Sequence, residues 1–233
     1  MSAIDFETVE ALTFDCYGTL IDWESGILAA LRPILDVRDV VEPDEHLLEL
    51  FGELEAEAES GDFLPYRAVL SEVARGIGVQ LGFETTEEES ADFAGSVVRW
   101  PPFADSPEAL AALSSRYRLA IVSNVDDDLF AGSQAQLGIS FDEVVTAQQV
   151  GSYKPNPGHF HEVLRRLDLP TEKVLHVAQS LYHDIGPARH LGLKCVWVNR
   201  RAGKGGAGAT KPSPAISDME VPDLATLVEA IEL

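Results

Sequence analysis

The sequence predicts an α/β fold in which helices cover both faces of a parallel sheet and an all-helical segment follows the first strand. Short runs rich in β-branched and other apolar residues predict the strands, at 11–15, 117–124, 143–147, 173–178 and 194–199. Helical patterns separate the later runs, and parallel neighbours need such crossovers. Between the first two runs the spacing is helical and no strand pattern occurs, which predicts the insert.

The insert lies between residues 22 and 100. Helical patterns cover most of it, at 47–58, 66–81 and 89–100. The two prolines that follow Trp100 end the last helix, because proline cannot continue one. We interpret the acids from Glu53 to Glu59 as a solvated helix face. The expected domains are a helical cap at 22–100 and a core formed by 1–21 and 101–233.

The core helices begin at recognisable signals. Ser106 and Pro107 open the pattern at 106–116, and an Asn-Pro pair opens 156–167. The chain ends in an amphipathic helical pattern, and the Gly- and Pro-rich segment 201–214 is either a flexible surface loop or a wall near a functional site. Right-handed crossovers align the carboxyl ends of parallel strands at one sheet edge, where ligands bind.

Composition limits the classes of partner. Apolar residues make up 45% of the 233 residues, enough for a core, and the formal charge of −22 disfavours nucleic acids and anionic membranes as main partners. The acidic bias fits either a high-salt cytoplasm or simply an acidic surface. Cys16 and Cys195 match no metal spacing and fit reduced thiols. With no membrane-length apolar run and no secretory pattern at the N-terminus, we expect a cytoplasmic protein.

Polar residues follow four of the predicted strands. Asp15 and Thr19 follow the first, Ser123 and Asn124 the second, Lys154 the third and Asp184 the fourth. Each alone is typical of a turn or a cap. Because all four strand ends lie at one edge of a parallel sheet, together they indicate an active site.

These residue types support one chemistry. Asp15 can attack a carbon or phosphorus centre and form an ester. Lys154 favours the ionised carboxylate, since an opposite charge nearby lowers its pKa. Ser123, Asn124 and free backbone amides after Asp15 can hold an anionic group. Asp184 can pair with the lysine and serve the water that opens the ester.

The segments "FDCYGTL", "SN", "YKPNP" and "AQSLYHDIGPA" resemble the four motifs of the haloacid dehalogenase superfamily. The resemblance covers nearly the whole chain and implies a Rossmann-like core with a helical cap. "FDCYGTL" and "SYKPNP" are similar to the type II 2-haloacid dehalogenase branch. The segments "ALTFDCYGTLIDWE", "TAQQVGSYKPNP", "SLYHD" and "GATKPSP" further resemble azetidine-2-carboxylate hydrolases, which open a strained ring so that an amine leaves.

The resemblance implies a role for each site residue. Asp15 is the expected nucleophile, Lys154 its ionic partner, Thr19 its hydrogen-bond donor and Asp184 the residue that serves water. The expected ligands of a substrate carboxylate are Ser123, Asn124 and the backbone amides of Cys16 and Tyr17. The implied reaction displaces a halide or a ring amine from the α-carbon of a small carboxylic acid and gives a 2-hydroxy acid.

Two positions argue against a metal. Phosphatases of the superfamily carry an acid two residues after the nucleophile and two acids in the last motif. In this chain Tyr17 stands two residues after the nucleophile, and Gln179 replaces the first of the two acids in the last motif, which leaves Asp184. A phenol is a poor acid at neutral pH, and Mg²⁺ prefers several carboxylates. We therefore expect no cofactor. The alternatives are an Mg²⁺-dependent phosphatase acting on a small monoester and a non-catalytic binding protein of the same fold.

Some positions depart from the dehalogenase pattern. In the dehalogenases a serine and an asparagine of the last motif hold the water, and Gln179 and Leu181 stand at these positions here. Tyr182 or His183 are the candidates to hold the water instead. Phe160 replaces a tyrosine. Glu53 aligns near the cap arginine that receives halide, although Arg67 is a second candidate. Trp23 either lines the pocket or packs the cap hinge. The expected partner is a small carboxylic acid, and the expected state a monomer or homodimer.

Overall fold

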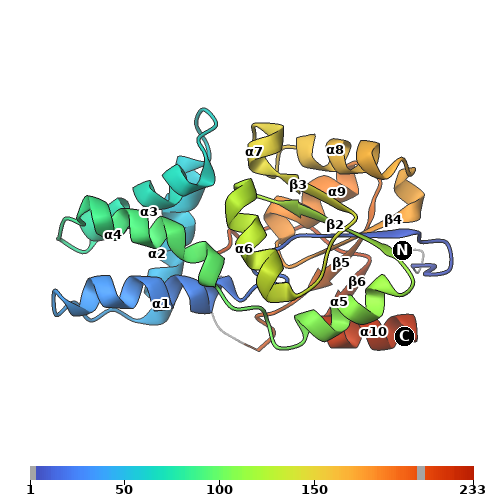
Figure 1. The fold of residues 1–233 in the computed structure, drawn as a ribbon, viewed down its shortest axis with the longest axis horizontal. Coiled ribbons are helices and arrows are strands. Elements are labelled where there is room, and N and C mark those ends of the chain that lie inside the picture. The colour runs from blue at the N-terminus through green and yellow to red at the C-terminus, as the bar shows by residue number, and fades with distance from the viewer. Residues whose placement is uncertain (1–3, 204–207) are drawn as a thin grey trace.

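The computed structural model describes residues 4–203 and 208–233. Its centre is a parallel sheet with the strand order β3-β2-β1-β4-β5-β6. The strands are β1 (Ala11–Phe14), β2 (Arg118–Ser123), β3 (Glu143–Thr146), β4 (Val174–Ala178), β5 (Lys194–Val198) and β6 (Met219–Val221). The first strand lies between β2 and β4, so the sheet is built outward from the middle and the first βα loop lies between two other strand ends (Figure 1).

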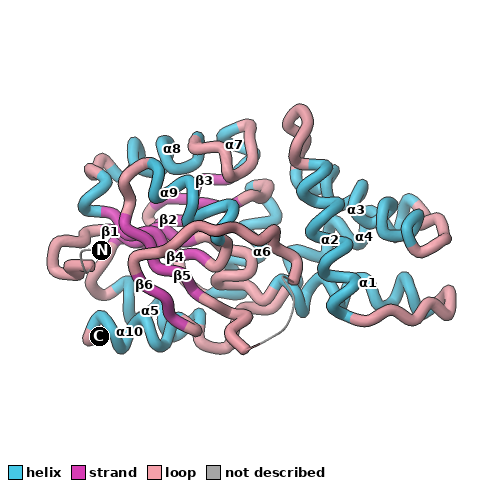
Figure 2. Tube along the Cα trace, turned by 180° about the vertical axis from the view of Figure 1, so that it is seen from behind, coloured by secondary structure: helices cyan, strands magenta, loops and turns pink. Residues whose placement is uncertain are grey.

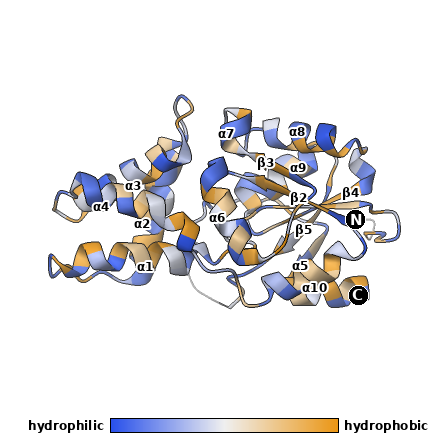
Figure 3. Ribbon diagram, in the orientation of Figure 1, coloured by the Kyte–Doolittle hydropathy of each residue, from blue (hydrophilic) through white to orange (hydrophobic). Residues whose placement is uncertain are grey.

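Helices cover both faces of this sheet, as the apolar strands predict. On one face, Leu12 and Phe14 of β1 share a core with α5 (Ser106–Ser114), α6 (Asp127–Leu137) and α10 (Leu224–Ile231). On the other face, Ala11 of β1 packs in a second core with α8 (Gly158–Leu167) and α9 (Gly186–His190). Short turns complete this layer: α7 (Ala147–Val150), η2 (Thr171–Lys173) and η3 (Leu181–Ile185), a single turn of π-helix. In Figure 3 the α8 helix carries a broad hydrophilic stretch.

The segment between β1 and β2 contains the helices α1 (Trp23–Asp36), α2 (Asp44–Ala58), α3 (Tyr66–Gln80), α4 (Glu87–Gly95) and η1 (Ser96–Arg99). They stand together at one end of the molecule, beyond the edge of the sheet (Figures 1 and 2). The helical insert predicted from the sequence is therefore present. Its division from the core at residues 22 and 100 stays a prediction.

One core residue fixes the cap helix α3 over the sheet. Asp126, which precedes α6, accepts hydrogen bonds from the backbone amides of Tyr66 and Arg67 at 2.9 Å each. These amides open α3 and have no partner within the helix. The carboxylate also complements the positive end of the helix dipole. Tyr66 is thereby placed beside the carboxyl edge of the sheet.

Among the described residues, no helix is long and apolar enough to cross a bilayer.

Candidate active site

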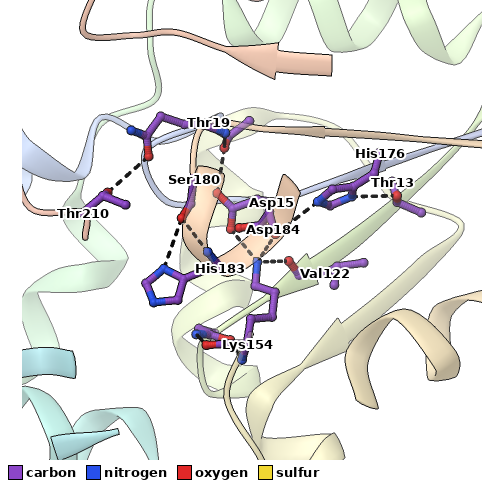
Figure 4. A network of polar contacts seen from close by, with 12 residues as sticks. Thr13, Asp15, Thr19, Val122, Lys154, His176, Ser180, His183, Asp184 and Thr210 are labelled. Atoms are coloured by element: carbon purple, nitrogen blue, oxygen red, sulfur yellow. Dashed lines mark hydrogen bonds and ion pairs between the residues drawn. The ribbon is translucent and has the colours of Figure 1, made fainter. Parts of the chain in front are cut away.

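The carboxyl edge of the sheet brings together the polar residues that follow four strands (Figure 4). Asp15 directly follows β1, and Ser123 is the last residue of β2. Lys154 follows the α7 turn after β3, and Asp184 lies in η3, after β4. A parallel sheet makes this convergence unavoidable, because all its strands end at the same edge.

Lys154 bridges two buried carboxylates. Its ammonium donates to Asp15 Oδ1 at 2.9 Å, to Asp184 Oδ1 at 2.6 Å and to the carbonyl of Val122 at 2.8 Å. The side chains of Lys154 and Asp184 are each 1% exposed and that of Asp15 is 9% exposed. Charges buried this deeply are stable only when paired, so removing Lys154 would leave two buried carboxylates without the positive charge that they share.

Burial and pairing set the proton affinities of the three groups. Burial raises the pKa of Asp15 above its ordinary value, although Lys154 opposes this. Burial acts in the same direction on Asp184, but Lys154 and His176 outweigh it and lower its pKa to about 2. Burial disfavours the charged Lys154, but the two carboxylates outweigh it and raise its pKa. The lysine is thus charged at neutral pH, and Asp184 is ionised.

Thr19 holds the other oxygen of Asp15. Its hydroxyl donates to Asp15 Oδ2 at 2.7 Å and accepts from the backbone amide of Gln179 at 2.9 Å. Together with Lys154 on Oδ1, this fixes both oxygens of the Asp15 carboxylate.

Asp184 has a further support that the sequence did not reveal. His176 Nε2 lies 3.1 Å from Asp184 Oδ1, and His176 Nδ1 lies 2.9 Å from the hydroxyl of Thr13. Both residues are fully buried in neighbouring strands. The sequence signal for this support is a threonine and a histidine in two predicted strands. It can be recognised only once the register that pairs Thr13 with His176 is known.

A cleft opens over Asp15 and Lys154. Ser123 lines it, is fully buried, and its hydroxyl has no hydrogen-bond partner among the described residues. Asn124 also lines the cleft, but its amide mainly fixes the Lys154 loop, accepting from the Lys154 amide at 2.7 Å and donating to the Lys154 carbonyl at 3.2 Å.

Cys16 and Tyr17 contribute differently. The side chain of Cys16 is buried outside the cleft, and burial raises the pKa of its thiol. The Tyr17 ring lines the cleft, but its hydroxyl lies 3.0 Å from Ser133 Oγ on α6. Burial raises the pKa of this phenol well above its ordinary value. Tyr17 therefore does not occupy the place of an acid facing a leaving group. The backbone amides of both residues donate to no described residue.

The cap helices supply the opposite wall of the cleft. The residues that line it are Trp23 of α1, Glu55 of α2, Glu59 directly after α2, and Tyr66 of α3. The interpretation of the acids from Glu53 to Glu59 as a solvated face is wrong for Glu55, which is 5% exposed. Leu48, Phe51, Glu55 and Glu59 follow helical spacing along one face. Two acids on the apolar face of a predicted helix were the sequence signal that these glutamates face the cleft and not the solvent.

Comparison with known protein families identifies the type of enzyme to which this site belongs. The sequence model of the haloacid dehalogenase-like hydrolases matches residues 9–192. The chain belongs to this family.

Individual relatives agree with the assignment. The (S)-2-haloacid dehalogenase of Xanthobacter autotrophicus is 28% identical over 201 residues, which cover 82% of this chain and 76% of that protein. The structure of an L-2-haloacid dehalogenase from the same organism, with chloropropionic acid covalently bound, has a TM-score of 0.80 at 23% identity and covers 96% of this chain and 98% of that one. The fold is thus that of these enzymes, and the chain is a 2-haloacid dehalogenase-like hydrolase.

A third relative differs in its named activity. The glyceraldehyde 3-phosphate phosphatase of Methanothermobacter thermautotrophicus is 37% identical over 101 residues, which cover 42% of this chain and 45% of that protein.

Several other family positions can now be placed. Phe160 is fully buried and packs edge-on against His176, with ring centroids 5.0 Å apart. Arg67 is an incorrect candidate for the halide position, because its guanidinium pairs with Asp128 at 2.5 Å outside the cleft. Glu53 is exposed and does not line the cleft. Trp23 lines the cleft, and its ring also packs edge-on against Phe51 of α2.

The residues considered for holding water also separate. Gln179 and His183 line the cleft, whereas Leu181 and Tyr182 do not. Gln179 Oε1 accepts from the hydroxyl of Thr210 at 3.3 Å, so part of the predicted loop 201–214 does lie at the site (Figure 4). Burial lowers the pKa of His183 to about 4, which leaves its ring neutral at pH 7.

Proposed function

We propose that this hydrolase displaces a leaving group from the α-carbon of a small 2-substituted carboxylic acid through an ester on Asp15. The product is a 2-hydroxy acid. The observation that carries the proposal is the buried bridge from Asp15 through Lys154 to Asp184, with Thr19 on the second oxygen of Asp15. In this arrangement Lys154 opposes the effect of burial on the Asp15 carboxylate, and Lys154 and Thr19 fix both of its oxygens beside a cleft, as a nucleophile requires.

In the first step an oxygen of Asp15 forms a bond to the α-carbon. The bond from that carbon to the leaving group breaks, and the leaving group departs with the electron pair. A halide leaves as the anion, whereas a ring nitrogen that enters protonated, as NH₂⁺, leaves as a neutral amine. Ser123 and the free amides of Cys16 and Tyr17 are suited to hold the substrate carboxylate, because each is an uncommitted donor beside Asp15.

In the second step water opens the ester. Its oxygen adds to the carboxyl carbon of Asp15, the acyl–oxygen bond breaks, and the substrate oxygen leaves as the product hydroxyl. Asp184 is the candidate base, because its Oδ2 makes no hydrogen bond to a described residue while Oδ1 is bound by Lys154. His183 is the candidate partner that orients the water.

The donor set does not suit Mg²⁺. The ion prefers several carboxylate and water oxygens, whereas here the Lys154 ammonium already bridges the Oδ1 atoms of both aspartates. No cluster of three or more metal-binding side chains occurs in residues 4–203 and 208–233. We therefore propose a reaction without a metal. The partial similarity to a phosphatase keeps phosphate-ester hydrolysis as the second candidate.

The leaving group is a halide or a ring amine. The 2-haloacid dehalogenase relatives favour halide. The resemblance to azetidine-2-carboxylate hydrolases favours an amine, as does a cleft whose described lining contains no arginine.

Proton NMR on one mixed panel tests the proposal. The panel holds 2-chloropropionate, azetidine-2-carboxylate and several phosphate monoesters, with Mg²⁺ or with chelator, and Asp15→Asn is the control. The expected result is a hydroxy acid that forms despite chelator and only with Asp15 intact. Phosphate release that requires Mg²⁺, without any hydroxy acid, would establish the phosphatase instead.

A further inference from the structure

The cleft is lined by more acidic than basic side chains. Four carboxylic acids line it, namely Asp15, Glu55, Glu59 and Asp184, and the single lysine or arginine in the described lining is Lys154. Lys154 is already shared between Asp15 and Asp184. The two cap glutamates form no ion pair with a lysine or arginine among the described residues.

Glu55 is held in a fixed position. Its Oε1 accepts a hydrogen bond from the hydroxyl of Tyr66 at 2.6 Å, and this tyrosine is fixed in turn by the core residue Asp126. The second oxygen, Oε2, makes no hydrogen bond to a described residue. Glu59 lies one helical turn further on, and its carboxylate has no hydrogen bond or ion pair among the described residues. Burial raises the pKa of Glu55 to about 7 and that of Glu59 well above its ordinary value.

A second observation points to a polar ligand in this cleft. The hydroxyl of Ser123 is fully buried, lines the same cleft and has no partner among the described residues. A buried hydroxyl without a partner costs free energy that a bound ligand can recover. Ser123 comes from the sheet side of the cleft, whereas the glutamates come from the cap. A ligand that spans the two thus meets a donor at one end and acceptors at the other.

We propose that Glu55 and Glu59, together with the aromatic faces of Trp23 and Tyr66, bind the ammonium group of the substrate. This inference rests on the proposed function, since it places the substrate carboxylate toward Ser123 and Asp15. The substrate class is then a small zwitterion that bears both a carboxylate and an organic ammonium group. Carboxylates donate no hydrogen bond but accept several, and aromatic rings attract a desolvated cation.

The electrostatics favour such a zwitterion over a simple halo acid or a phosphate ester. Burial already disfavours the ionised forms of Glu55 and Glu59, and either anion would disfavour them further and find no positive partner there. An ammonium group favours the ionised carboxylates and supplies the missing partner. Lys211, whose charge also acts on Glu59, lies over the ring of Tyr182 and does not line the cleft.

Calorimetric binding to the intact protein tests the subsite without requiring turnover. The probes are L-proline and cyclopentanecarboxylate, which have the same ring size and differ by an NH₂⁺ in place of a CH₂. We expect proline to bind at least about tenfold more tightly, which is the effect of one charge-assisted hydrogen bond. Glu55→Gln and Glu59→Gln keep the shape of the side chain and should each reduce this preference. Glu53→Gln is the matched control, because Glu53 is exposed on the same helix.

Equal affinity for the two probes, tighter binding of cyclopentanecarboxylate, or no saturable binding of either would overturn the subsite. So would a proline preference that survives both substitutions in the cleft. Should one variant fail to fold, the other still decides, since each removes one acid. Failure of the proposed function would be detected separately. It is tested by whether a hydroxy acid forms only when Asp15 is intact, and not by the ratio of the two affinities.

Discussion

At the scale of single residues, the site depends on one ammonium between two buried carboxylates. Replacing Lys154 by Met leaves Asp15 and Asp184 unpaired in the protein interior. We expect the free energy of unfolding at pH 7 to fall by about 3–5 kcal/mol, as for other buried pairs that lose one partner. Urea denaturation measures it. Lys173→Met is the control, because Lys173 pairs with Glu10 at the surface and should cost under about 1 kcal/mol. Similar losses for both variants would contradict this role of burial.

Glu55 should give the protein a measurable pH dependence of stability. Burial raises its pKa from 4.5 to about 7, so between these values the folded protein keeps a proton that the unfolded chain has lost. The free energy of unfolding therefore falls as pH rises through this window. The full loss is on the order of 3 kcal/mol, at about 1.4 kcal/mol per pKa unit.

Glu55→Gln removes this titration. Relative to the wild type, the variant should gain stability when the pH is raised from 5 to 8, as measured by urea denaturation at both values. An unchanged difference between variant and wild type across that range would show that Glu55 is not protonated in the folded protein. Glu53→Gln, on the exposed side of α2, should show no such gain.

At the scale of elements, a core aspartate sets the position of the cap helix α3. Asp126 accepts from the first two amides of α3 and is itself buried. Asp126→Ala should destabilise the protein by about 1–2 kcal/mol, the usual cost of a lost helix cap. It should also lower kcat/KM, because Tyr66 and Glu55 lose their anchor. Asp128→Ala is the control, since the side chain of Asp128 forms an exposed ion pair with Arg67 and no other hydrogen bond or ion pair among residues 4–203 and 208–233. Equal effects of the two substitutions on kcat/KM would argue against the anchor.

The elements divide into those that the sequence could predict and those that it could not. The strands β1 to β5 follow from β-branched runs, and helices such as α5 and α8 from their proline-bearing starts. The strand β6 was not predicted, because Met219–Val221 is too short for a pattern. The approach of Asp15, Lys154 and Asp184 was predictable because a parallel sheet imposes it. The approach of Glu55 and Tyr66 depends on how α2 and α3 pack, which the sequence alone does not specify.

At the scale of the whole molecule, the charge of −22 should make stability depend on salt. Excess negative charge repels itself in the compact state, and added ions screen charges more than about 10 Å apart at 0.1 M. We therefore expect the urea midpoint to rise as sodium chloride is increased from low millimolar concentrations to about 0.5 M, where the Debye length is only a few ångströms. A midpoint that falls with salt would mean that the surface ion pairs, and not the repulsion, dominate.

The central claim for the whole enzyme is that Asp15 carries the substrate as an ester. A single turnover in H₂¹⁸O, with enzyme in excess over 2-chloropropionate or azetidine-2-carboxylate, tests it most directly. Water opens the ester at the carboxyl carbon of Asp15, so mass spectrometry should find ¹⁸O in the peptide that contains Asp15 and an unlabelled hydroxyl in the product. Label in the product hydroxyl, with none in Asp15, would mean that water attacks the substrate directly and would contradict the ester mechanism.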